Sequence, residues 1–294
     1  MWYNGGGMRP LLPSSLAPAF SKRPPDLHKY AAGTVAIVGG SARYPHAPVI
    51  AALGARAAGA GLVQLVVPDA SRVAAGALVP EAIFAEQAPA CVPLRADAIA
   101  MGMGLGISQD SESLVSHILS GTPGRFVLDA DALGLLAKWH AAGSLPKSGE
   151  QPLVLTPHAG EAARLLACSP EEIQADRPAA ARRIADRYQA TVVLKGPHTL
   201  VAAYGREEMF ECEAGNPFMA LGGMGDLLAG ALAARWAYLS KTLPAPDAAF
   251  LAACAAVWLH ATASDALVAA DPPADPSIVN TAHALASLRV TLEK

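Results

Sequence analysis

Short, unbroken runs of apolar residues recur along the chain, and glycines or polar residues follow most of them. A run without alternation is typical of a strand that is covered on both faces, as in a parallel sheet. Between the runs lie alanine- and leucine-rich segments with the composition of helices. The predicted strands are Thr34–Val38, Leu62–Val67, Ala98–Met101, Phe126–Leu128, Leu153–Leu155 and Thr191–Leu194.

Helices are predicted between these strands, so the two kinds of element alternate. The predicted helices are Ala47–Ala60, Ser71–Leu78, Asp110–Leu119, Ala132–Trp139, Ala162–Leu166 and a long charged helix, Pro170–Tyr188. A hairpin through Val201 and Phe210 follows, and two helices, Asp247–Asp265 and Ser277–Lys294, end the chain. The alternation predicts an α/β fold with a mostly parallel central sheet and helices on both faces.

The chain shows no internal repeat and no linker, and 294 residues suit one large α/β domain. Residues 1–20 contain three consecutive glycines and three prolines, so we predict a disordered leader there and a single domain over residues 21–294. With 52% hydrophobic and 16% charged residues, this domain should bury a large core.

Charge and cysteine content exclude several classes of partner. A formal net charge of −3 gives no electrostatic reason to expect nucleic acid or an anionic membrane. No uninterrupted apolar run approaches the roughly 20 residues of a membrane span. The cysteines lie far apart without a C-x-x-C pair, and the histidines lack paired i, i+4 spacing, so we predict no protein-bound metal, no disulfide framework and a cytoplasmic setting.

The glycine-rich stretch Gly215–Asp226, which runs into the apolar segment Leu227–Trp236, points most directly to chemistry. Three glycines within four positions permit a tight turn with positive φ, and a buried helix is predicted after it. Such a turn would direct unpaired N–H groups and the positive end of the helix dipole at an anion. Asp226 adds a carboxylate that can accept a proton. An anion site beside a base suits phosphoryl transfer to a hydroxyl; the alternative is that Asp226 only caps its helix.

Other polar residues follow successive predicted strands. In an open parallel sheet, ligands bind beyond the carboxyl ends of the strands, so these residues should converge. They are Gly39–Ser41, Gly102–Gly106, Asp129, Asp131, His158, Glu161 and Lys195–Thr199. Each also has a local alternative: Asp131 as a helix cap, His158 as a turn residue and Lys195 as a solvated cation.

The two neighbouring aspartates form a separate question. Asp129 and Asp131 would point to the same face if the strand conformation continued through them. There they would hold a divalent metal or make unrelated hydrogen bonds, and the second is our prediction. The Gly39-Gly40-Ser41 loop lacks the G-x-G-x-x-G spacing of a dinucleotide-binding Rossmann unit, so none is predicted.

Together, these motifs resemble those of the bacterial ADP-dependent NAD(P)H-hydrate dehydratases of the ribokinase-like superfamily. The resemblance, from about residue 20 to the C-terminus, rests on His28-Lys29, Gly39-Gly40-Ser41, Gly102-x-Gly104-Leu105-Gly106, Asp129-Ala130-Asp131-Ala132-Leu133, Leu155-Thr156-Pro157-His158-x-Gly160-Glu161, Leu194-Lys195-Gly196, Gly215-Asn216-Pro217 and Gly222-Gly223-x-Gly225-Asp226. It implies a ribokinase-like three-layer α/β/α domain, without the epimerase domain that is fused to many relatives. It also implies that ADP or ATP phosphorylates the C6 hydroxyl of the S epimer of hydrated NADH or NADPH, after which phosphate is eliminated.

The resemblance also implies a role for each matching residue. Asp226 would be the base on the hydroxyl, and the backbone amides of Gly223, Met224, Gly225 and Asp226 would steady the transferring phosphoryl group. Contacts with the hydrate would come from Ala47, Gly104, Gly106, His158 and Asp226. Contacts with the adenine nucleotide would come from Lys195, Gly196, Pro197, His198, Thr199 and Gly225. Mg²⁺ would arrive with the nucleotide, and we expect a homo-oligomer, a tetramer being one form.

Some positions depart from the family pattern. Met224 replaces a usual threonine, Phe218 a glycine, Leu221 a threonine, Met103 a proline and His46 a glycine. Met224 is compatible with activity if the loop works through main-chain N–H groups, whereas the ring of Phe218 can narrow the nucleotide site. Two other readings therefore stay open: a ribokinase-like kinase for a small hydroxylated metabolite, and a non-catalytic nucleotide-binding relative.

Overall fold

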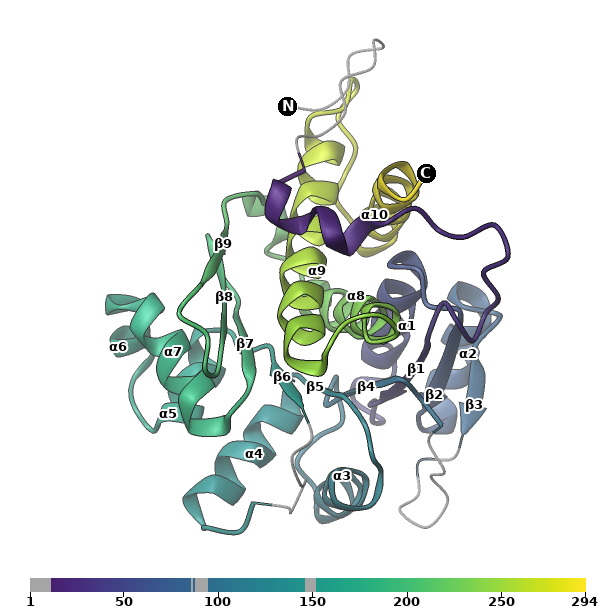
Figure 1. Cartoon of the computed structure of the whole chain (residues 1–294). Coiled ribbons are helices and arrows are strands. Elements are labelled where there is room, and N and C mark those ends of the chain that lie inside the picture. The colour runs from purple at the N-terminus through teal and green to yellow at the C-terminus, as the bar shows by residue number, and fades with distance from the viewer. Residues whose placement is uncertain (1–11, 86, 88–94, 146–151) are drawn as a thin grey trace.

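A single sheet of nine strands runs through the molecule (Figure 1). The structure is a computed structural model that describes residues 12–85, 87, 95–145 and 152–294. The strand order is β3-β2-β1-β4-β5-β6-β7-β8-β9. The strands are β1 (Thr34–Val38), β2 (Leu62–Val66), β3 (Ile83–Ala85), β4 (Ala98–Met101), β5 (Phe126–Leu128), β6 (Leu153–Leu155), β7 (Thr191–Leu194), β8 (Thr199–Ala203) and β9 (Phe210–Cys212).

The predicted mostly parallel sheet is confirmed. Strands β1 to β7 pair in parallel, and only the pairs β7–β8 and β8–β9 are antiparallel, the second being the predicted hairpin. The edge strand β3 was not predicted. It has only three residues, and its Ile83 side chain is 49% exposed, so it lacks the buried apolar run by which the other strands were recognised.

Two helical layers cover the sheet, which confirms the three-layer α/β/α prediction (Figure 1). Val35 and Ile37 of β1 pack into one core, and Ala36 and Val38 into the other, as the alternation of strand side chains requires. The first layer contains α1 (Ala47–Ala57), α2 (Asp69–Leu78), α8 (Met224–Leu239), α9 (Ala245–Val268) and α10 (Ile278–Leu292). The second contains α3 (Gln109–Gly121), α4 (Asp131–Ala141), α5 (Ala159–Leu166), α6 (Pro170–Ala175) and α7 (Arg177–Tyr188).

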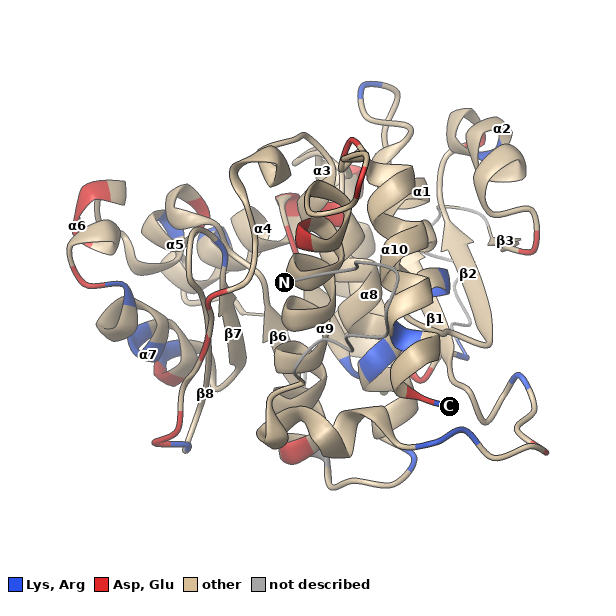
Figure 2. Ribbon diagram, turned by 90° about the horizontal axis from the view of Figure 1, so that it is seen from above, with Lys and Arg blue, Asp and Glu red and all other residues tan. Residues whose placement is uncertain are grey.

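The long helix predicted over Pro170–Tyr188 is wrong, because the structure divides it into α6 and α7. Asp176 leaves the helical conformation and caps α7 by accepting a hydrogen bond from the N–H of Ala179 (3.0 Å). Pro178 explains the break, since a proline inside a helix removes one hydrogen bond and clashes with the preceding turn. The charged residues Arg182, Arg183, Asp186 and Arg187 of α7 are exposed. Figure 2 shows basic and acidic positions along this helix.

The predicted disordered leader is wrong for its C-terminal half. Residues Ser14–Phe20 form a 3₁₀ helix, η1, whose Leu16, Ala19 and Phe20 are buried. The ring of Phe20 packs edge-on against Trp258 of α9, with 6.0 Å between ring centroids. Burial of these apolar side chains outweighs the glycine- and proline-rich composition on which the prediction was based. Residues 1–11 lie outside the described part of the chain.

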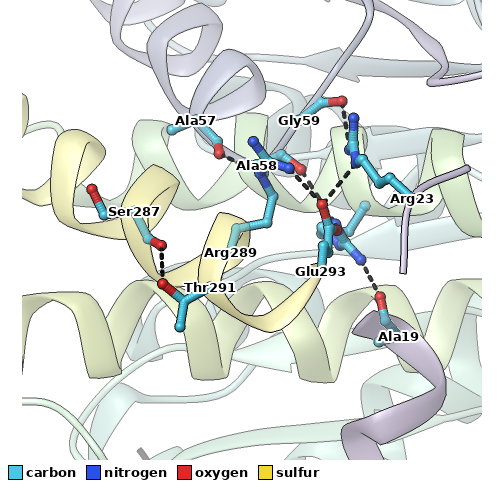
Figure 3. A network of polar contacts seen from close by, with 10 residues as sticks. Ala19, Arg23, Ala57, Ala58, Gly59, Ser287, Arg289, Thr291 and Glu293 are labelled. Atoms are coloured by element: carbon cyan, nitrogen blue, oxygen red, sulfur yellow. Dashed lines mark hydrogen bonds and ion pairs between the residues drawn. The ribbon is translucent and has the colours of Figure 1, made fainter. Parts of the chain in front are cut away.

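A buried ionic cluster joins the two ends of the domain (Figure 3). Glu293, which follows α10, pairs with Arg235 (2.5 Å), Arg289 (2.5 Å) and Arg23 (2.7 Å). Burial alone would raise the pKa of Glu293, but the three guanidinium charges outweigh it and lower the pKa. The arginines also donate to carbonyls at the end of α1, where the helix dipole is negative, which offsets their excess charge. The cluster thereby fixes α10 and the N-terminal segment to α1.

Helix α9 is long and apolar enough, by length and composition alone, to cross a membrane, but 72% of its apolar window is buried inside the domain. It packs against α8 and α10 as a core helix. Helix α8 lies between α9 and α1, and the crossing with α1 is so close that a Cβ on Gly230 would lie 1.7 Å from the carbonyl oxygen of Ala51. Two helices of ordinary side chains could not approach this closely, so the pair of glycines Gly54 and Gly230 sets the position of α8.

Candidate active site

The glycine loop forms the predicted turn. Gly223 precedes α8 with φ +98°, a conformation that favours glycine, and a Cβ there would lie 2.8 Å from the Cδ1 atom of Ile50. Helix α8 then begins at Met224, whose N–H donates to the carbonyl of Leu221 (3.3 Å). Within the described residues, no acceptor lies within hydrogen-bonding reach of the N–H groups of Gly225 and Asp226. The start of α8 therefore offers free donors and a positive dipole end to an anion.

Asp226 lies in the first turn of α8, and its carboxylate accepts no hydrogen bond from the described residues, so the alternative of a simple helix cap is wrong. Burial raises the pKa of Asp226 to about 7, and the negative charges of Asp129, Glu161 and Asp131 act in the same direction. Lys195 opposes them. A carboxylate that titrates near neutral pH is suited to act as a general base.

Asp129 and Lys195 form a buried ion pair beside Asp226. Asp129 is 1% exposed, and its Oδ1 atom accepts hydrogen bonds from Lys195 Nζ (2.7 Å) and from Thr156 Oγ1 (2.7 Å). Burial disfavours the charged form of Lys195, but Asp129 and Glu161 outweigh this effect and raise its pKa. The ammonium also reaches α8, because a Cβ on Gly225 would lie 3.2 Å from Nζ. Lys195 is thus not the solvated cation of the local alternative.

The backbone between the two aspartates departs from the prediction. Strand β5 ends at Leu128, and Ala130 has φ 48° and ψ −117°, so the strand does not continue through Asp129 and Asp131. The two side chains nevertheless both act on Asp226. Asp131 Oδ2 accepts a hydrogen bond from the N–H of Gly106 (2.7 Å), which holds the loop after β4 against α4. Protein donors therefore bond to both carboxylates, as the hydrogen-bond alternative predicted.

Of the residues expected to contact the hydrate, Gly106 and His158 are bonded to members of the acidic group, which consists of Asp129, Asp131, Glu161 and Asp226. Gly104 lies against the start of α1, where a Cβ on it would be 2.9 Å from that of Ala47. Gly106 is bonded to Asp131, as described above. His158 caps α5: its Nδ1 atom accepts from the N–H of Gly160 (3.0 Å), and its own N–H donates to Glu161 (2.8 Å), which leaves the ring 57% exposed. The contact of His158 with substrate stays a prediction.

The segment expected to bind the nucleotide, Lys195–Thr199, forms the turn between β7 and β8. Thr199 Oγ1 donates to the carbonyl of Gly196 (2.8 Å), and His198 lies 3.0 Å from Glu211 of β9. Pro197 lies between Gly196 and His198 in this turn. Arg177 of α7 donates a hydrogen bond to the carbonyl of Leu194 (3.1 Å), at the end of β7 where the turn begins. Of these residues, Lys195 alone forms ion pairs with Asp129 and Glu161. Its side chain therefore lies at these carboxylates, whereas the other side chains stay in the turn.

Sequence reasoning missed the residue that holds the start of the glycine loop. Asp265 of α9 accepts hydrogen bonds from the N–H of Gly215 (2.8 Å) and from Asn216 Nδ2 (2.8 Å). Asn216 in turn accepts from the N–H of Phe218 (3.1 Å). Asp265 lies far along the chain in an apolar helix, and no motif marked it. The ring of Phe218 is 64% exposed, so it does not fill the interior of the site.

The comparison with known sequences agrees with this geometry. The family model of the NAD(P)H-hydrate dehydratases matches residues 35–282. The chain belongs to this family. It is 39% identical to the ADP-dependent (S)-NAD(P)H-hydrate dehydratase of Neisseria meningitidis serogroup B over 254 residues, covering 84% of this chain and 81% of that protein. It is 35% identical to the bifunctional NAD(P)H-hydrate repair enzyme of Escherichia coli over 250 residues, but it spans only 45% of that longer protein.

Solved structures confirm the ribokinase-like fold of this family member. A ribokinase-like superfamily protein of Enterococcus faecalis V583 superposes with a TM-score of 0.81 at 25% identity, covering 100% of both chains. The ADP/ATP-dependent NAD(P)H-hydrate dehydratase of Bacillus subtilis, which was co-crystallised with ATP/Mg²⁺, superposes with a TM-score of 0.78 at 28% identity. That match covers 94% of each chain.

The departures from the family pattern fall into two groups. Met103 and Met224 are buried, and Met224 packs with its neighbours in the core that covers the α1 side of the sheet. Its side chain therefore lies in the core, and what position 224 presents at the loop is backbone. Leu221 (48% exposed) and Phe218 are largely exposed, as is His46 before α1. The dimensions of the turn at Gly223–Asp226 thus do not depend on any of these side chains being threonine or glycine.

Proposed function

We propose that this protein is an ADP- or ATP-dependent (S)-NAD(P)H-hydrate dehydratase in which Asp226 is the base. One observation supports this assignment above the others: a carboxylate whose pKa is raised to about 7 lies in the first turn of a helix whose leading N–H groups are free. A base and an anion site are thereby held on the same turn of backbone. This is the arrangement that phosphoryl transfer to a hydroxyl requires.

In the proposed reaction, ionised Asp226 accepts the proton of the C6 hydroxyl of the hydrate. The adenine nucleotide supplies the phosphoryl group. The N–H groups of Gly225 and Asp226, together with the dipole of α8, stabilise the negative charge that develops on the transferring group. The same donors stabilise the phosphate as the C6–O bond breaks, and loss of the C5 proton to the departing phosphate or to solvent forms the C5=C6 double bond of the dihydropyridine ring.

Asp226 is a better candidate for the base than the other carboxylates nearby. Asp129 is buried and already bonded to Lys195 and Thr156, and Asp131 accepts from the N–H of Gly106. Protein donors thus already bond to both of these carboxylates, whereas the carboxylate of Asp226 accepts no hydrogen bond from the described residues. Their negative charge instead raises the pKa of Asp226, so these residues tune the base without touching the proton that moves.

The nucleotide is assigned to the face of the site formed by Lys195–Thr199 and Gly225. Mg²⁺ is assigned to the nucleotide phosphates, because the described residues contain no group of three side chains that could hold a metal ion, and protein donors occupy Asp129 and Asp131. Cys168, Cys212 and Cys254 are free thiols, which suits the cytoplasm, while Cys91 lies outside the described residues. A homo-oligomeric state completes the proposal.

The test is to incubate the protein with Mg²⁺, ADP or ATP, and (S)-NADH hydrate, and to follow recovery of the NADH absorbance band together with phosphate release. Both should appear with the wild type and fall by about a thousandfold with Asp226→Asn. Phosphorylation of another small metabolite without recovery of NADH would establish the kinase alternative. Nucleotide binding without phosphate release from any substrate, unchanged in Asp226→Asn, would establish the non-catalytic alternative.

A further inference from the structure

A cavity of about 660 Å³ opens beside the acidic group, between the loop after β4 and the helices α4 and α5. One face of α4 lines it, with Asp131 at one end and Lys138 two turns further along, and α5 contributes Glu161 and Arg164. Ile107 and Leu135 add apolar surface. This volume is within the range of small-molecule sites, which is about 300 to 1,000 Å³. No residue of the glycine loop lines the cavity, so it extends the site rather than repeating it.

Charge is distributed unevenly within this cavity. Its two carboxylates are occupied: Asp131 accepts from Gly106, and Glu161, which is 6% exposed, accepts from the N–H of His158. Its two cations lie at the exposed edge. Lys138 is shared with Glu112 (2.6 Å), whereas the guanidinium of Arg164 meets no hydrogen-bonding or ion-pair partner among the described residues. Arg164 is thus the cation in this cavity whose donors are not engaged by the described residues and are open to a ligand.

The cavity adjoins two of the positions assigned to the hydrate, Gly106 and His158. Ile107 directly follows Gly106, and Glu161 belongs to the capping box of His158. A dinucleotide is much longer than its reactive ring. If the ring lies at Asp226 and contacts Gly106 and His158, as proposed, the rest of the molecule can extend into the neighbouring cavity, which Ile107 and Glu161 line. The phosphate groups of the dinucleotide then reach a guanidinium that presents a planar, bidentate donor set for them.

We infer that this cavity binds the phosphate-bearing adenosine end of the dinucleotide hydrate, and that Arg164 is the residue that recognises its phosphate. The inference rests on the proposed function and assigns the substrate-binding role to residues outside the family motifs quoted above. The phosphate is either the pyrophosphate, which NADH and NADPH hydrates share, or the 2′-phosphate, which only the NADPH form carries. Arg164 would in the second case set the preference for NADPH.

The test compares the Michaelis constants of wild type and Arg164→Gln for both hydrates and for ADP. We expect KM for NADPH hydrate to rise about tenfold with kcat unchanged, since one charge-assisted contact is lost far from the reacting atoms. An equal rise for NADH hydrate identifies the pyrophosphate, and no rise for NADH hydrate identifies the 2′-phosphate. Arg183→Gln, at an exposed position on α7, is the matched control and should change neither constant.

Gly134→Leu provides a second variant that leaves charge unchanged. A Cβ at Gly134 would meet nothing within 4 Å, so the larger side chain should fold normally, project into the cavity and raise KM for the hydrates. A rise in KM for ADP alone, or wild-type constants in both variants, would overturn the inference. Titration of NADPH binding by fluorescence tests this inference separately from the proposed function. Arg164→Gln should weaken NADPH binding whether or not the protein catalyses dehydration of the hydrate.

Discussion

Replacing Asp226 by asparagine should stabilise the protein at alkaline pH while it removes activity. Because the folded-state pKa of Asp226 is raised to about 7 from 3.8, the folded protein holds this proton more tightly than the unfolded chain does. The resulting stability is fully present below pH 3.8, declines as the pH rises above it, and is lost once the pH has passed about 7. Above that pH, the ionised carboxylate of Asp226 lies beside other negative charges. Asparagine carries no charge and avoids this repulsion.

The magnitude follows from the size of the shift. About three pKa units at about 1.4 kcal/mol each give a ceiling near 4 kcal/mol for the free energy of unfolding. Asp226 is partly exposed and Lys195 can move toward it, so we expect about 1 to 2 kcal/mol at pH 9, or about 2 to 5 °C in Tm. Near pH 4 the protonated acid and the amide should be almost equivalent, and the difference should vanish.

Urea unfolding of wild type and Asp226→Asn between pH 4 and pH 9 measures this difference directly. Asp186→Asn, at an exposed position on α7, is the control and should give a difference that hardly changes over this range. A constant difference for Asp226→Asn, or a variant less stable than wild type at pH 9, would refute the idea that burial and repulsion raise the pKa of this group.

The remaining predictions concern the groups around this base. The value of kcat/KM should rise with pH through an apparent pKa of about 7. Lys195→Met should move this midpoint upward in pH–rate profiles, because Lys195 opposes the rise in the pKa of Asp226. Asp265→Asn should lower kcat about tenfold in steady-state assays with little loss of Tm, since it releases the start of the glycine loop at Gly215. Glu293→Gln should cost about 3 kcal/mol in urea unfolding without changing KM, because it leaves the buried Arg235 and the partly buried Arg23 and Arg289 uncompensated.

The sequence contained the strands and the glycine turn because both are encoded locally. Six apolar runs identified six strands of the sheet. A parallel strand that is buried on both faces is a continuous apolar run in the sequence, so it can be recognised without knowing its neighbours. The positive φ of Gly223 was foreseen for the same reason, as a tight turn of glycines has few alternatives. The break before α7 could also have been foreseen, because Pro178 was visible in the sequence.

What the sequence did not contain is how charges pair across the fold. Lys195 and Asp129 are 66 positions apart, and Asp265 is 50 positions from the backbone it holds. Neither pairing follows from any local pattern, and the pKa of Asp226 depends on the first of them. The packing of η1 on α9 was missed for a related reason. The three buried apolar side chains of η1 stabilise it only when α9 is present to cover them.

These pairings explain how a site rich in carboxylates can accept phosphate. Lys195 cancels the charge of Asp129, and the N–H groups at the start of α8 face the site without competing acceptors. Asp226 is the carboxylate left to titrate, and with a pKa of about 7 it is protonated about half of the time at neutral pH. A phosphorylated nucleotide therefore meets less negative charge than the residue types suggest. Under the proposed function, the hydroxyl of the substrate would then meet a base that is not weakened by a direct salt bridge, because Lys195 pairs with Asp129 and not with Asp226.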